Sequence, residues 1–91
     1  MSMQFFDRLP EQAIQLLKYL ADRGSASQKE LIDNLDLPLR TIRYSIRRLK
    51  EEQFIVSKPD LLDMRSLKYE INQTNMKKIE IILKEYNESL V

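Results

Sequence analysis

The stretch that decides the fold runs from Ser27 to Lys50 and reads SQKELIDNLDLPLRTIRYSIRRLK. Ser27, followed three residues later by Glu30, has the form of a capping box, in which a hydroxyl and a carboxylate close the start of a helix. Pro38 disfavours helical angles in the residue before it and is itself suited to a first helical turn. The stretch therefore predicts a short helix over 28–35, a turn, and a second helix over 38–52.

Upstream, a further helix is expected over 10–23. Pro10 suits its first turn, and Gly24, the only glycine of the chain, stands where a left-handed cap would end it. The spacing i, i+3, i+4, i+7 of one buried face is set by Ala13, Leu16, Leu17 and Leu20.

Downstream, residues 54–58 are rich in strand-forming side chains, and residues 67–71 alternate apolar and charged side chains. These two segments predict a hairpin, and a helical pattern resumes at Thr74 and continues to Leu90. A helix-turn-helix followed by a hairpin is a winged helix. We expect an α+β, mainly α, fold: a winged helix-turn-helix of three helices plus a two-stranded β-hairpin wing, with an added C-terminal helix.

Composition excludes several classes of function. The 91 residues suit one modest core, and they include no Cys and no His. No carboxylates are spaced for acid–base work, so the chain is not expected to be an enzyme, to use a cofactor or to hold a metal. No apolar stretch is long enough to cross a membrane and the N-terminus lacks the pattern of a signal peptide, so a cytoplasmic location is expected.

The net charge of +1 hides an uneven distribution. Residues 38–50 carry five basic side chains and no acidic one, whereas the rest of the chain carries ten basic and 14 acidic side chains. The chain therefore has one positive segment and an acidic remainder, which favours an anionic partner at a single face.

The basic side chains of helix 38–52 fall on one side of it, opposite Ile42, Ile46 and Leu49. Such a helix fits the major groove of duplex DNA, where arginine bonds phosphates or guanine edges bidentately. The alternative is a solvated face, which would normally carry interspersed acids. Tyr44 is left open, since its ring suits either DNA or the edge of the core. The DNA-binding candidates on this helix are Arg40, Thr41, Arg43, Tyr44, Arg47, Arg48 and Lys50, with Ser45 as a further hydroxyl.

The run from Ser27 to Ile55 resembles the core of prokaryotic winged-helix transcriptional regulators of the MarR and ArsR types. Their pattern includes a Gly that is replaced here by Gln53, which either takes a left-handed conformation at a cost of about 1 kcal/mol or marks a different helix end. The run from Asp63 to Ile71 is similar to the D-x-R wing pattern of these regulators. The resemblance implies that Arg65 reaches DNA and that Asp63 positions it.

The wing, residues 58–68, also contains Lys58 and Lys68, for which we expect non-specific attraction to phosphate. The chain is accordingly divided into a winged-helix DNA-binding domain (1–72) and a C-terminal dimerisation helix (73–91).

The last helix has more apolar residues than one face of a small domain needs. Its 3, 4, 3, 4 spacing is typical of a helix seam, and two-fold pairing would set two DNA-reading helices about 34 Å apart. The alternative is that the helix packs wholly on its own domain. The expected dimer interface comprises Met76, Ile79, Ile82, Leu83, Tyr86, Leu90, Phe5 and Phe6.

The function expected from these features is that of a sequence-reading protein for double-stranded DNA. We expect a homodimeric transcriptional regulator, cytoplasmic and associated with the nucleoid. Helix 38–52 would enter the major groove, and the wing would touch the adjacent backbone or minor groove. The alternative is a winged-helix protein-interaction module within a larger assembly, because fold alone does not fix function.

Overall fold

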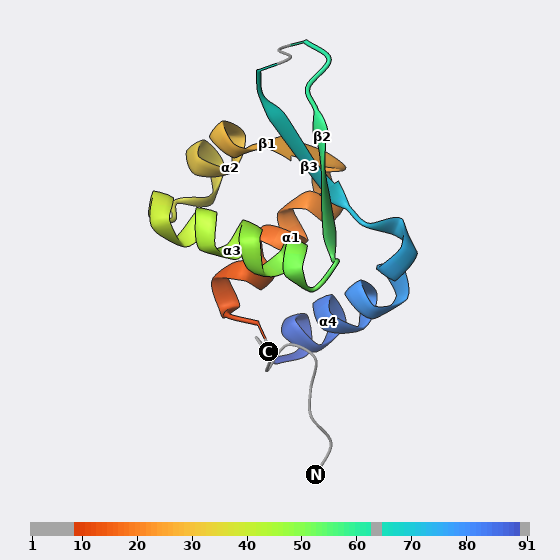
Figure 1. The fold of residues 1–91 in the computed structure, drawn as a ribbon. Helices are drawn as coiled ribbons and strands as arrows, with labels where there is room; N and C mark the ends of the chain where they lie inside the picture. The colour runs from red at the N-terminus through yellow and green to blue at the C-terminus, as the bar shows by residue number, and fades with distance from the viewer. Residues whose placement is uncertain (1–8, 63–64, 90–91) are drawn as a thin grey trace.

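The computed structural model describes residues 9–62 and 65–89, and in these ranges the chain forms a helical domain with one small sheet (Figure 1). In chain order the elements are α1 (Glu11–Arg23), β1 (Ser25–Ser27), α2 (Gln28–Leu35), α3 (Leu39–Glu51), β2 (Ile55–Pro59), β3 (Leu67–Ile71), the 3-10 helix η2 (Gln73–Asn75) and α4 (Met76–Ser89). The predicted class is confirmed: the fold is a mainly helical winged helix-turn-helix with an added C-terminal helix.

The sheet has one strand more than the sequence predicted. Its order is β1-β3-β2, with both pairings antiparallel, so β3 is central. Ala26 of β1 and Ser57 of β2 both face Tyr69 of β3 in register. β1 escapes prediction because three residues are too few to display an alternating pattern. β1 pairs only with residues 68–70, so the outer part of the β2–β3 hairpin extends beyond it as the wing.

The helix ends of the helix-turn-helix form as the sequence predicts. The backbone N–H of Glu30 donates to the Ser27 hydroxyl at 3.1 Å, which is the capping bond expected at the start of α2. Gly24 ends α1 with a positive φ of +94° but with ψ −51°, which is outside the left-handed helical region that the sequence predicted, and its N–H donates to the Leu20 carbonyl at 2.8 Å. Positive φ strains most side chains, so the single glycine stands where the backbone needs it.

Gln53 takes the left-handed conformation, with φ +62°. Its N–H donates to the Lys50 carbonyl at 3.0 Å, and the N–H of Phe54 donates to the Leu49 carbonyl at 2.9 Å. These two bonds form a Schellman motif, which usually has glycine at this position. The first of the two alternatives for Gln53 is therefore correct: α3 ends as in the related pattern, on a strained residue.

One hydrophobic core unites the elements, and it includes α4. Ile79, Ile82 and Tyr86 are buried, the first two completely. The Tyr86 hydroxyl lies 3.5 Å from a Glu11 carboxylate oxygen. The prediction that these three α4 residues face a second copy is therefore wrong, because they already pack in the core of one chain. No helix in the described ranges is long and apolar enough to cross a membrane.

Candidate nucleic-acid interface

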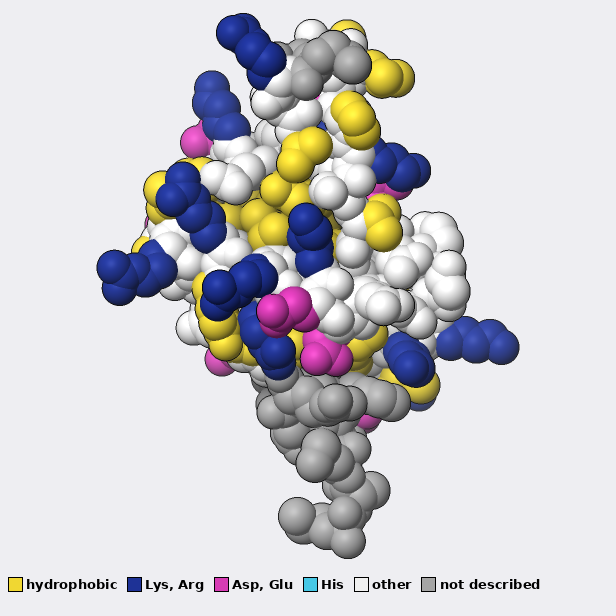
Figure 2. All heavy atoms as spheres, viewed as in Figure 1, with side chains coloured by type: hydrophobic (Ala, Val, Ile, Leu, Met, Phe, Trp, Pro, Cys, Tyr) yellow, Lys and Arg dark blue, Asp and Glu magenta, His cyan; other side chains and the backbone are white. Residues whose placement is uncertain are grey.

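α3 divides its side chains between the core and solvent as the sequence predicts. Its buried side is formed by Ile42, Ser45, Ile46 and Leu49. The opposite side exposes Arg40, Arg43, Arg47 and Lys50. Figure 2 shows dark blue side chains gathered over this part of the molecule, below the wing. The exposed side of α3 is thus a continuous row of cations about as long as the helix.

Tyr44 lies on the exposed side of α3, with 43% of its surface accessible. The guanidinium carbon of Arg47 lies 5.6 Å from the centre of the Tyr44 ring, within the range of a cation–π contact. Both side chains line a shallow hollow of about 370 Å³, together with Arg40 and Arg43. Of the two alternatives for Tyr44, the structure has it beside the cations and not at the edge of the core.

Two α3 residues that the sequence assigned to DNA, Arg48 and Ser45, do not lie on the exposed side of the helix with the row of cations. Arg48 is half-buried on the flank of α3, where its guanidinium lies 3.6 Å from Glu51 and 3.9 Å from Glu52. Its charge is therefore partly offset by the two acidic side chains at the end of α3. Ser45 is completely buried, and its hydroxyl has no hydrogen-bond partner among the described residues. The expectation that Ser45 reaches DNA is wrong, because its side chain lies on the core side of α3. The other hydroxyl residue predicted to contact DNA, Thr41, is half-buried.

The basic residues predicted for the wing also differ in exposure and in pairing. The Lys58 ammonium lies 3.0 Å from the Glu70 carboxylate, so this lysine is paired across the hairpin. Lys68 is half-buried and stands opposite Lys58 in register, whereas Arg65 is exposed. Asp63, expected to position Arg65, lies outside the described residues.

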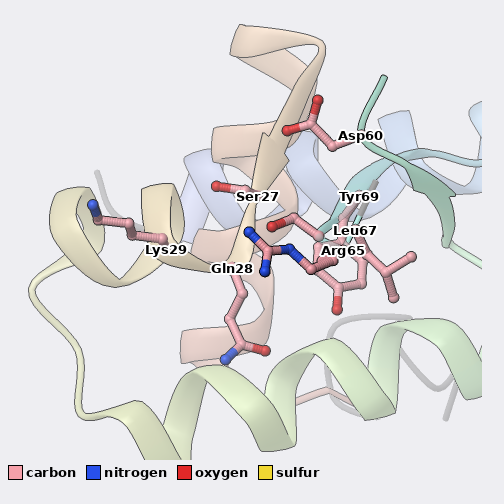
Figure 3. Close-up of a pocket in the computed structure, with 8 residues that line it drawn as sticks. Ser27, Gln28, Lys29, Asp60, Arg65, Leu67 and Tyr69 are labelled. Carbon is pink, nitrogen blue, oxygen red and sulfur yellow. The ribbon is translucent and has the colours of Figure 1, made fainter. Parts of the chain in front are cut away.

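A second hollow of about 370 Å³ separates the wing from the start of α2 (Figure 3). The Arg65 side chain is directed across it toward Ser27, and the Gln28 side chain extends from α2 toward α3. Lys29, which follows in the same turn, also lines the hollow. Gln28 and Lys29 are not among the residues predicted for the site. The capping box at Ser27 could have indicated them, because it fixes where the first turn of α2 lies.

The arrangement offers cations from three elements around one surface. Arginines and a lysine follow α3, Arg65 lies on the wing, and Lys29 lies on α2. Arginine forks suit phosphate and guanine edges, and the N-terminal turn of a helix favours negative charge. Within residues 9–62 and 65–89, no three acidic side chains gather in a way that could hold a metal ion. The chemistry of this surface is that of an anion-binding face.

Comparison with protein families identifies the class of protein to which this fold and surface belong. The family model described as "Winged helix-turn-helix DNA-binding" matches residues 9–56, which is more than half of the chain. The protein belongs to the winged helix-turn-helix DNA-binding family. A comparison with curated proteins finds no match.

Solved structures of MarR-type regulators share the fold at low sequence identity. The adhesin competence repressor AdcR from Streptococcus pyogenes is 15% identical, with a TM-score of 0.75 over 92% of this chain and 62% of its own. ZitR from Lactococcus lactis is 13% identical, with a TM-score of 0.80 over 99% of this chain and 60% of its own. A variant of MarR from E. coli complexed with operator DNA is 14% identical, with a TM-score of 0.73 over 90% of this chain and 61% of its own. The chain thus spans about three fifths of the length of these proteins.

Proposed function

We propose that the protein is a transcriptional regulator that reads double-stranded DNA with the exposed side of α3. The observation that carries this proposal is the row formed by Arg40, Arg43, Arg47 and Lys50 on the helix that follows the turn of the helix-turn-helix. In this class of fold that helix lies in the major groove. The comparison with MarR supports the proposal, since a variant of that protein of like fold was solved with operator DNA.

In the proposed complex the wing, residues 58–68, lies on the backbone or minor groove beside the site bound by α3. The hollow between Arg65 and the first turn of α2 supports this placement, because it is open and lined mostly by polar and basic side chains, with Asp60 as the one acidic side chain among the described residues. Arg65 is the wing residue expected to contribute most. Lys58 contributes less, because its ion pair with Glu70 already offsets its charge. Thr41 and Lys68 make lesser contacts, because both are half-buried, and Tyr44 contributes beside Arg47 within the row.

We further propose that two copies pair through the outer side of α4, so that residues 1–72 bind DNA and residues 73–91 form the dimer arm. Ile79, Ile82 and Tyr86 are buried in the core, so fewer apolar residues of α4 are available for a dimer interface than the sequence suggested. Leu83 lines a hollow of about 520 Å³ on α4 together with Glu80 and Lys84, whose charges suit a self-complementary contact. Met76 lies half-buried on the same helix. Leu90, Phe5 and Phe6, which lie outside the described residues, remain proposed members of this interface.

The experiment that tests the proposed function is selection of bound duplexes from a random pool by the native chain. A dimeric reader of DNA enriches a palindrome whose half-sites lie one helical turn apart. Enrichment of a single unrepeated site supports DNA reading and rejects the dimer. A pool that emerges without enrichment contradicts sequence reading, and if the chain also fails to bind duplex at low salt, the alternative of a protein-interaction module stands in its place.

A further inference from the structure

Two neighbouring leucines of the wing are almost completely exposed. Leu61 has 87% of its surface accessible and Leu62 has 93%, the largest values among the exposed large hydrophobic residues of the described chain. Leu67, at the start of β3, is 47% exposed. Leaving apolar surface in water is unfavourable, and a cluster of such side chains usually marks a surface that becomes covered. The wing therefore carries an apolar surface, formed by these three leucines, that none of the contacts above explains.

The backbone around the leucines is held by hydrogen bonds. Pro59 and Leu67 form the last pair of the β2–β3 ladder. Beyond them the N–H of Asp60 donates to the Ser66 carbonyl at 3.0 Å, and the N–H of Leu62 donates to the Asp60 carboxylate at 2.9 Å. The second bond is an Asx turn, which fixes the direction of the chain at Leu61 and Leu62. These two hydrogen bonds hold the backbone that leads into Leu61 and Leu62.

The described part of this surface is small compared with the interface of an ordinary protein partner. A stable protein–protein interface buries about 800 Å² on each side and is supplied by about 20 or more residues. Within the described part of the wing, which leaves out residues 63–64, the exposed large hydrophobic residues are these three leucines. The other exposed large hydrophobic residues, Leu39, Tyr44 and Ile81, lie on α3 and α4 and do not extend it. The surface therefore suits a narrow partner into which a few side chains can be inserted.

The position of the surface points to DNA. In Figure 2 yellow side chains lie along the wing on the same face that carries the cations of α3 below it. Arg65 follows Leu62 by three residues in the same wing and supplies a positive charge there. A minor groove about 6 Å wide excludes a helix but accepts the side chains of a hairpin end. Proteins that enter this groove often insert leucine or similar side chains between base pairs and bend the duplex by about 20–90°.

We infer that Leu61 and Leu62 enter the minor groove beside the site bound by α3, open a base step there and bend the DNA. This inference rests on the proposed function, because it requires α3 to be seated on the same duplex. Pyrimidine–purine steps such as TA open most readily, so the leucines confer a preference for such a step at a position that no polar side chain reads. The protein is then an architectural as well as a sequence-reading DNA binder.

The test measures duplex bending together with affinity. A duplex containing a selected site carries fluorophores at its two ends, and energy transfer between them reports the bend when the native chain binds. The double variant Leu61→Ser/Leu62→Ser is compared with the native chain, because both leucines lie outside the proposed dimer arm. We expect the native chain to bend the duplex by about 20° or more. The leucine variant should bind with at most a tenfold loss and leave the duplex nearly straight.

A second duplex replaces the TA step at the position proposed for the leucines by GG. This change should weaken binding of the native chain several-fold and leave the affinity of the leucine variant unchanged. Equal bending by the native chain and the leucine variant, or binding without any bend, overturns the inference and leaves the proposed function standing. Failure of the native chain to bind duplex at all overturns both. Should the serine variant lose its cooperative thermal transition, Leu61→Ala/Leu62→Ala shortens the same side chains with less change in polarity and is judged by the same outcomes.

Discussion

The side-chain amide of Asn72 donates a 2.8 Å hydrogen bond to the main-chain carbonyl of Gln53, and Asn75 donates a second, of 2.7 Å, to the same oxygen. Gln53 is the left-handed residue that ends α3. Asn72 caps the start of η2 and Asn75 is its last residue, and η2 leads directly into α4. One carbonyl oxygen thus joins the end of the proposed DNA-reading helix to the start of the proposed dimer arm. A dimer built through α4 would hold its two copies of α3 at a fixed spacing through this joint.

The two asparagines should differ in their effect on stability. Asn72→Ala removes the bond to Gln53 and also the 3.1 Å bond that the Asn72 side chain accepts from the Thr74 N–H, whereas Asn75→Ala removes only the bond to Gln53. Each net bond contributes about 0.5–1.5 kcal/mol. In urea denaturation we expect Asn72→Ala to lower the free energy of unfolding by about 1–2 kcal/mol and Asn75→Ala by about half as much. Equal losses would mean that the cap on Thr74 contributes nothing.

Gln53→Gly should stabilise the protein. A left-handed backbone costs a residue with a Cβ about 1–2 kcal/mol, and glycine's greater freedom in the unfolded chain returns part of that gain. The free energy of unfolding should rise by about 0.5–1 kcal/mol. Asp36, with φ +52°, provides the control, because aspartate tolerates this conformation and Asp36→Gly should gain less. A loss of stability in Gln53→Gly would show that the glutamine side chain contributes more than its backbone strain costs.

Ser45→Ala should also stabilise the protein. The Ser45 hydroxyl is buried with no hydrogen-bond partner in the described part of the chain, which costs about 1–3 kcal/mol, and alanine is the better helix former. Thermal and urea denaturation should show a gain of about 1–2 kcal/mol. Affinity for duplex DNA should stay the same, because the side chain lies on the core side of α3. A variant that is less stable than the native chain would contradict the buried, unpaired hydroxyl.

Glu70→Gln should strengthen DNA binding by releasing Lys58. The ion pair of 3.0 Å is more than half exposed on the lysine side, so breaking it costs little stability. A freed lysine near phosphate adds about 0.9 to the magnitude of the slope of log affinity against log salt. Asp22→Asn on α1 is the control, because it removes the same charge from an exposed position outside the wing and outside the proposed dimer arm. If both variants gain equally, the effect is one of net charge and Lys58 makes no contact.

The fold could be predicted because its local signals agree with one another. Ser27, Gly24 and Pro38 mark helix ends through chemistry that acts within a few residues, and the structure has the elements where these signals stand. The strand β1 could not be predicted, because its three residues are held by pairing with β3, a partner more than 40 residues away. Periodicity reports which residues share a face but not which neighbour will cover that face.

The same limit explains the errors at the candidate sites. The 3, 4, 3, 4 spacing of α4 predicted a seam facing a second copy, yet Ile79 and Ile82 pack in the core of their own domain, where α4 contacts α1. Arg48 and Lys58 belong to basic segments but are paired with acids that stand three, four and twelve residues away along the chain. The exposure of Tyr44 likewise depends on which side of α3 packs against the core, and the sequence left this open for that residue. Residue type predicted a cationic helix, and packing decided which cations are available.

The central claim, that the exposed side of α3 binds duplex DNA, is tested most directly by the affinity of Arg43→Ala/Arg47→Ala for a duplex across a range of salt concentrations. The matched control is Lys77→Ala/Lys78→Ala, which removes two exposed cations from α4. We predict that the α3 variant binds at least tenfold more weakly, with a log–log salt slope less negative by about 0.9 for each phosphate that the variant no longer neutralises. The control should match the native chain. Equal affinity and equal slope for the native chain and the α3 variant would contradict the claim.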